Sequence, residues 1–151
     1  MSKRLEVFKL APQAYQGFAA VKAYVATCGL PGELVELVNL RVSLLNGCAY
    51  CIDMHTRDLL KRGVKADKLA LLAVWEEAAA LFSDKERAAL AWAETVTRIA
   101  ETRAPDADYE KAAAVFSDKE LADLTVLISL MSAFNRFGVS MRMAPAALTL
   151  A

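Results

Sequence analysis

The chain has 151 residues, of which 56% are hydrophobic, and its 18 Lys and Arg residues balance its 18 Asp and Glu residues. A chain of this length buries roughly 70% of its unfolded surface, so we expect a single domain over residues 1–151 that needs no disulfide bonds for stability. The balanced charge gives no electrostatic reason to expect binding to nucleic acid or to an anionic membrane surface. The apolar excess favours a homo-oligomer that buries a shared face.

The sequence predicts neither a signal peptide nor a membrane-spanning segment. Residues 1–6 carry charge without a following uninterrupted apolar stretch. The longest apolar run, at residues 124–134, includes hydroxyl side chains and is too short to span a bilayer. We therefore expect a cytoplasmic protein, in which the cysteines are reduced, catalytic or metal-binding rather than structural.

Apolar residues recur at helical spacing along the chain, and no segment alternates as a β-strand does. Gly29 and Gly63 are expected to end helices, and Pro31 is expected to open one at the first-turn position that proline tolerates. Two Ser-x-x-Glu capping boxes, beginning at Ser83 and Ser117, predict the starts of two later helices. We therefore predict an all-α fold, a multihelical bundle of about seven helices. The predicted helices cover residues 12–28, 31–45, 48–62, 67–81, 83–101, 107–115 and 117–144.

Residues 46–55, Asn-Gly-Cys-Ala-Tyr-Cys-Ile-Asp-Met-His, hold two of the three cysteines and the only histidine. Residues three and four apart share a helix face, so Cys48 can meet Cys51 and Cys51 can meet His55. The Asn-Gly turn signal before them places the cysteines in the first turn of a helix, where unpaired backbone N–H groups favour a thiolate. This is a recognised way to make a cysteine nucleophilic at neutral pH.

This arrangement of thiols and imidazole suits redox chemistry. Two cysteines three apart on a helix can close a disulfide with little movement and open it again. His55 can take the proton of Cys51 or stabilise its anion. Attack on a peroxide would give a sulfenic acid, which the second cysteine condenses to a disulfide and an external thiol then reduces. The pattern predicts a peroxidase or dithiol oxidoreductase that needs no metal or other cofactor beyond a redox-active Cys48–Cys51 disulfide.

Two alternatives fit the same spacing. The cysteines could simply pack in a core, or Cys48, Cys51, His55 and a carboxylate could form a tetrahedral zinc shell. Structural zinc sites usually bring a second pair of ligands from elsewhere, and here Cys28 is the only other sulfur ligand of that kind. Haem attachment is excluded because Ile52, not histidine, follows the second cysteine. A non-catalytic zinc-binding or helical interaction module therefore stays open, and Cys28 is expected to be inert.

The run from Glu36 through Cys48-Ala49-Tyr50-Cys51 to His55 resembles the signature of the AhpD-like alkylhydroperoxidases of the carboxymuconolactone decarboxylase superfamily. The family pattern is Glu, eleven residues, Cys-x-x-Cys, three residues and His, and this chain fits that spacing. The resemblance is firm over residues 33–63 and looser to about residue 143. The flanking segments at residues 40–43, 56–58 and 134–136 are also similar to family sequences.

The resemblance implies an all-helical AhpD-like fold that assembles as a homo-oligomer, often a trimer or hexamer. It also implies a proton relay in which Glu36 lies behind His55, in direct contact or through a water molecule, and His55 draws the proton from Cys51. Cys51 would attack the peroxide and Cys48 would be the resolving thiol. Tyr50 occupies a position where some members have histidine, and it is a further candidate. Helix-dipole logic instead favours Cys48 as the more acidic thiol.

Several activities remain open at this point. The leading prediction is a thiol-dependent hydroperoxidase in antioxidant defence, and a close variant is a disulfide reductase that serves a separate peroxidase. The reductant could be a lipoyl protein, a thioredoxin-like protein or a small thiol. The decarboxylase branch of the superfamily lacks the dithiol, so the presence of both cysteines argues against lactone decarboxylation. Asn135 and Arg136 are expected to brace the site or a subunit contact.

Overall fold

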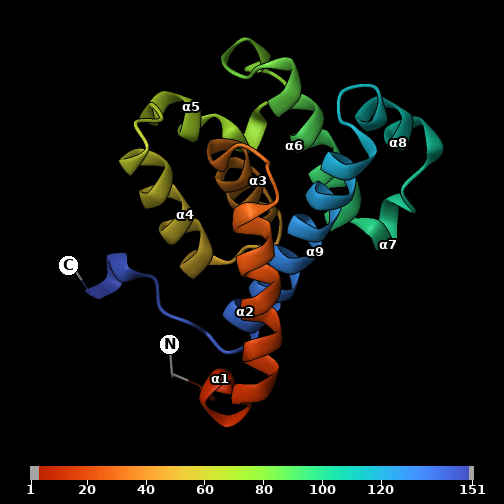
Figure 1. Ribbon diagram of the computed structural model, residues 1–151. Coiled ribbons are helices and arrows are strands. Elements are labelled where there is room, and N and C mark those ends of the chain that lie inside the picture. The colour runs from red at the N-terminus through yellow and green to blue at the C-terminus, as the bar shows by residue number, and fades with distance from the viewer. Residues whose placement is uncertain (1–3, 150–151) are drawn as a thin grey trace.

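The computed structural model describes residues 4–149, and within this range the backbone forms helices and no β-strand (Figure 1). This confirms the predicted all-α fold. Six of the seven predicted helices correspond to the helices α2, α3, α4, α6, α8 and α9. In chain order the elements, with 3₁₀-helices labelled η, are α1 (Val7–Leu10), α2 (Pro12–Thr27), α3 (Gly32–Leu45), α4 (Ala49–Lys61), α5 (Ala66–Ala70), η1 (Leu72–Val74), η2 (Ala79–Leu81), α6 (Asp84–Thr97), α7 (Ile99–Thr102), α8 (Asp106–Ala113), α9 (Asp118–Ser140) and η3 (Ala146–Thr149).

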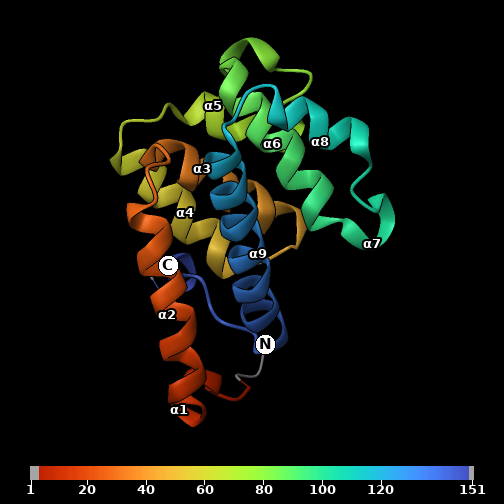
Figure 2. The ribbon, with the colours of Figure 1, turned by 45° about the vertical axis from the view of Figure 1, so that its right-hand side comes forward.

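Helix α3 lies at the centre of the bundle and packs against α4, α6 and α9. Its sequence is apolar over a wide face, and the helix buries polar side chains too, among them Asn39, Arg41 and Ser43. A wide apolar face is expected for a helix that is buried on most sides. Helix α2 packs along α9, extends past the end of the bundle and carries α1 at its tip (Figures 1 and 2).

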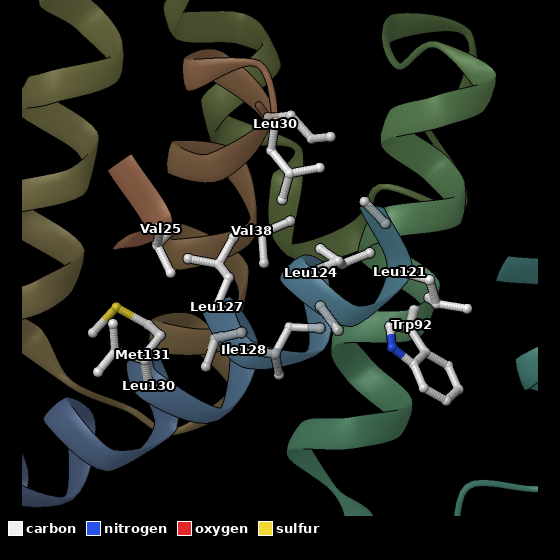
Figure 3. Close-up of a cluster of buried hydrophobic side chains, with 14 of the residues drawn as sticks. Val25, Leu30, Val38, Trp92, Leu121, Leu124, Leu127, Ile128, Leu130 and Met131 are labelled. Atoms are coloured by element: carbon white, nitrogen blue, oxygen red, sulfur yellow. The ribbon is translucent and has the colours of Figure 1, made fainter. Parts of the chain in front are cut away.

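The larger hydrophobic core fills the space between α2, α3, α6 and α9. Val25, Val38 and Leu127 gather where α2, α3 and α9 meet (Figure 3). Trp92 joins this core from α6, and its indole N–H donates a hydrogen bond to Thr125 Oγ1 at 2.9 Å. These contacts fix the position of α9 against α3, which the site described below requires.

The prediction of one continuous helix over residues 67–81 is wrong. Helix α5 ends at Ala70, and turns and the short elements η1 and η2 follow it. The guanidinium of Arg41 donates to the carbonyl of Ala73 at 3.0 Å, and the indole of Trp75 donates to Glu94 Oε1 at 2.6 Å. Glu94 also pairs with Arg41 at 2.8 Å. These tertiary bonds outweigh the helix propensity of an Ala- and Leu-rich segment.

Other helix boundaries follow local signals more closely. Both capping boxes are present, since the hydroxyl oxygens of Ser83 and Ser117 each accept a hydrogen bond from the backbone N–H three residues later. The predicted helix over residues 83–101 is interrupted at Arg98, which divides it into α6 and α7. Helices α1 and η3 lie outside the predicted set. Within the described range, no helix has the length and apolar character needed to cross a bilayer.

Candidate active site

The turn between α3 and α4 positions both cysteines. Gly47 has a φ of +66°, a left-handed conformation that glycine adopts without steric cost. The chain therefore reverses sharply, and the backbone N–H of Cys48 donates to the carbonyl of Ser43 at 3.0 Å. Cys48 is the N-cap residue of α4, and Cys51 lies in the first helical turn. The predicted start of this helix is thus confirmed.

The two sulfur atoms lie in direct contact inside the protein. Their Sγ atoms are 2.7 Å apart, and both residues are buried free cysteines. At this separation the pair needs only a small movement to form a disulfide bond.

Helix α9 closes the site behind Cys48. A Cβ atom built on Gly138 would lie 2.6 Å from Cys48 Sγ, so only glycine lets α9 approach this closely. Asn135, one turn earlier, donates to Ser43 Oγ at 3.1 Å and accepts from the Asn46 side chain at 3.1 Å. The side chain of Asn135 is buried beside the dithiol, whereas Arg136 is exposed and donates to the carbonyl of Ser132.

Sequence reasoning missed the contributions of Ser43 and Gly138. A glycine in the interior of a long helix costs about 1 kcal/mol relative to alanine and therefore signals a packing requirement. That signal was present at Gly138. Ser43 has no comparable signal, because a single serine on a helix is common.

Glu36 and His55 form a close pair across α3 and α4. His55 Nδ1 lies 2.6 Å from Glu36 Oε2, and the imidazole is buried. Among the described residues, His55 Nε2 has no hydrogen-bond partner although it is also buried. Because the carboxylate holds Nδ1, the second nitrogen is the one available to accept or donate a proton in the site.

The two thiols differ strongly in acidity. With Cys48 as the thiolate, the Cys51 thiol donates a hydrogen bond to it, and this bond is the main reason why the pKa of Cys48 is lowered to about 6. The backbone N–H of Cys51 lowers it further, as the helix-dipole argument predicts. The same bond, together with burial, raises the pKa of Cys51. One proton therefore stays on the pair when Cys48 ionises.

Cys51, rather than Cys48, is the cysteine that a ligand in the cavity can reach. A cavity of about 550 Å³ is lined by Glu36, Tyr50, Cys51 and His55, together with many apolar side chains, but not by Cys48. Cys51 is thus the sulfur that a bound molecule would meet. The structure brings all five sequence-predicted site residues together, with Cys48 directly behind Cys51.

Two further sequence hypotheses concern metal ions and Cys28. Within residues 4–149, no group of three or more His, Cys, Asp or Glu side chains is arranged to hold a metal ion. Cys28 caps the end of α2, where its Sγ atom donates to the carbonyl of Val25 at 3.1 Å. It does not line the cavity.

Comparison with known proteins gives a consistent assignment. Residues 12–95 match the Carboxymuconolactone decarboxylase family. The chain is 32% identical to the uncharacterized protein YdfG of Bacillus subtilis over 141 residues, which are 93% of this chain and 95% of YdfG. It is 39% identical to alkyl hydroperoxide reductase AhpD of Rhizorhabdus wittichii over 61 residues, which are 38% of this chain and 35% of that protein.

A crystal structure from Agrobacterium tumefaciens has the same architecture, with a TM-score of 0.91 at 37% identity. The match covers 95% of this chain and 98% of the other, which is a protein of unknown function proposed to be the antioxidant defence protein AhpD. The long match to the family and the shared fold lead to one conclusion: the chain belongs to the carboxymuconolactone decarboxylase family, as an AhpD-like member.

Proposed function

We propose that the protein is a thiol-dependent hydroperoxide reductase that cycles Cys48 and Cys51 between dithiol and disulfide. The observation that carries this proposal is a pair of sulfur atoms 2.7 Å apart, of which one, that of Cys51, belongs to a residue that lines a largely apolar cavity. His55, whose buried Nε2 has no hydrogen-bond partner among the described residues, lines the same cavity. Such a site combines a nucleophile, a resolving thiol and a proton carrier.

The first step would occur at Cys51. Its proton passes to Cys48 or to His55 Nε2, and the Cys51 thiolate attacks the terminal oxygen of the hydroperoxide. An S–O bond forms and the O–O bond breaks, so that the alkoxide leaves and takes a proton from the site as an alcohol. Cys51 becomes a sulfenic acid, and the peroxide has received two electrons.

The second step would use the acidity of Cys48. The Cys48 thiolate attacks the Cys51 sulfur, the S–S bond forms, and the S–O bond breaks to release hydroxide, which is protonated to water. A thiol reductant, such as a lipoyl protein, a thioredoxin-like protein or a small dithiol, then supplies two electrons and restores the dithiol.

Glu36 would act as a positioning residue for His55. A carboxylate on Nδ1 fixes the orientation and tautomer of the imidazole and stabilises its protonated form. Tyr50 contributes cavity wall beside Cys51.

A disulfide reductase that serves a separate peroxidase is the second candidate. The low pKa of Cys48, the first cysteine of the pair, favours it, because acidic N-terminal thiols of Cys-x-x-Cys motifs are suited to dithiol–disulfide exchange. This activity would use the same dithiol without direct attack on a peroxide.

The test is a thiol and zinc count on purified protein before and after one equivalent of cumene hydroperoxide, with Cys28→Ser as the background. We expect two thiols per chain to disappear and to return with dithiothreitol. In Cys48→Ser, dimedone should trap a sulfenic acid, whereas Cys51→Ser should not react. Intact thiols that react only with a disulfide substrate would support the reductase instead. If the thiols stay intact and the protein holds one zinc ion per chain, the redox proposal is wrong and the cysteines form a metal site.

A further inference from the structure

Two positively charged side chains line the cavity beside Cys51 without an ion-pair partner among the described residues. Lys22 from α2 and Arg62, the C-cap residue of α4, both line it. No hydrogen bond or ion pair joins either head group to another residue within 4–149. Glu36 has the only carboxylate among the described residues that line the cavity, and this carboxylate is already paired with the imidazole of His55.

The position of Arg62 depends on a small neighbour. A Cβ atom built on Gly32, the first residue of α3, would lie 2.8 Å from Arg62 Nη1. Glycine at this position therefore leaves the space that the guanidinium occupies at the cavity wall.

The charged and reactive groups lie at opposite ends of α4. Cys51 and Arg62 are eleven residues apart, which corresponds to about 16 Å along the axis at the helical rise per residue. Apolar side chains, including those of Val35, Met54 and Leu130, line the same cavity. A ligand that reaches both ends needs an anionic head, a long apolar chain and a reactive group within that chain.

We propose that the substrate class is a long-chain fatty-acid hydroperoxide whose carboxylate is held by Arg62 and Lys22. This inference rests on the peroxidase function proposed above and names its substrate. The planar guanidinium of Arg62 suits a carboxylate, which it can bind through two parallel hydrogen bonds, and Lys22 adds a second positive charge. The volume of about 550 Å³ lies in the range of small-molecule sites.

The reaction would leave the carboxylate unchanged. The hydroperoxide group is reduced to a hydroxyl group, water is released, and the dithiol of Cys48 and Cys51 becomes a disulfide. The product is the corresponding hydroxy fatty acid.

The test compares rates of thiol oxidation by linoleic acid hydroperoxide, by its methyl ester and by cumene hydroperoxide, all below micelle-forming concentrations. Wild-type protein should react with the acid about tenfold faster than with the ester, since a charge-assisted hydrogen bond contributes on this scale. Arg62→Gln should abolish most of the preference for the acid over the ester and Lys22→Gln part of it, and the rate of each variant with cumene hydroperoxide is the reference for both. Lys61→Gln is the matched control, because Lys61 is exposed on the same helix and does not line the cavity.

The outcomes separate the two proposals. If cumene hydroperoxide oxidises the pair but the acid and ester react equally in wild type, the carboxylate site is wrong and the peroxidase stands. If no hydroperoxide oxidises the pair, the peroxidase is wrong, and calorimetric titration with decanoate and decanol tests the cavity alone. If decanoate binds and Arg62→Gln weakens its binding, the proposed carboxylate site stands. No binding, or equal binding of decanoate and decanol, would overturn it.

Discussion

At the scale of single residues, Cys48 and Cys51 contribute different properties to one pair. Cys48 is the more acidic thiol, and Cys51 lines the cavity. After ionisation the remaining proton stays mainly on Cys51, so attack by Cys51 would require this proton to move across the hydrogen bond to Cys48 or to His55. The pair as a whole would therefore combine the acidity of one cysteine with the access of the other.

This arrangement predicts the pH dependence of the reaction. The pKa of Cys48 is lowered to about 6, whereas an ordinary cysteine loses its proton only near about 8.5. Since the thiolate is the reactive form, the rate of oxidation by cumene hydroperoxide should be high and nearly constant above neutral pH. The rate should fall as the pH decreases through about 6. Stopped-flow kinetics would measure this profile, and a rate that keeps rising up to the pKa of a free thiol would contradict it.

The Glu36–His55 pair gives a second prediction at this scale. Glu36→Gln keeps the size of the side chain but removes the charge that orients and stabilises the imidazolium. We expect the oxidation rate to fall roughly 10- to 100-fold, by analogy with the loss found when the hydrogen-bond partner of a metal-bound histidine is removed. The pH profile should also shift, which a purely structural loss would not cause. Glu33→Gln is the control, since Glu33 lies in the first turn of the same helix and pairs with Lys68 instead.

At the scale of secondary-structure elements, the approach of α9 to the dithiol depends on Gly138. Alanine is the better helix former, yet its Cβ would clash with Cys48 Sγ. We therefore expect Gly138→Ala to lower the free energy of unfolding by about 1–3 kcal/mol, as overpacked cores do. In Gly17→Ala, where a Cβ on α2 would meet no neighbour, stability should stay equal or rise by up to about 1 kcal/mol. Urea unfolding compares the two, and an equal gain in both variants would contradict the close packing.

The elements also show what the sequence can and cannot predict. The starts of α6 and α9 depend on capping boxes that span four residues, so the local sequence was enough to predict them. The break after Ala70 depends on Arg41 and Glu94, which are distant in sequence, so propensity alone gave a false helix.

The residues of the site also fall into those that the sequence predicted and those that it did not. The cysteines lie three apart on one helix and were predicted from spacing, and Glu36 was placed beside His55 by the family register. The contacts of Asn135 and Gly138 join segments about 90 residues apart. The glycine inside a long helix indicated close packing and the family resemblance indicated a bracing role for Asn135, but neither signal identified the partner residue. The cationic part of the cavity likewise depends on how α2 and α4 lie in space.

At the scale of the whole molecule, an apolar groove remains exposed between α2, α6, α8 and α9. Its volume is about 630 Å³, and its walls include Val21, Trp92, Tyr109 and Val126. Val21, Tyr109 and Val126 are also among the exposed large hydrophobic residues of the chain. The composition already favoured a shared apolar face, so we propose that a second copy of the chain covers this groove in a homo-oligomer.

This proposal predicts the effect of one surface charge. Val126→Asp would bury a carboxylate in the interface without touching the dithiol, and the desolvation cost should shift the protein towards smaller species. Val74→Asp is the matched control, because Val74 is similarly exposed but does not line the groove. Light scattering after size-exclusion chromatography would measure the mass of each variant. A wild-type protein that is monomeric at every concentration, or a Val126→Asp variant with unchanged mass, would show that another surface or none forms the assembly.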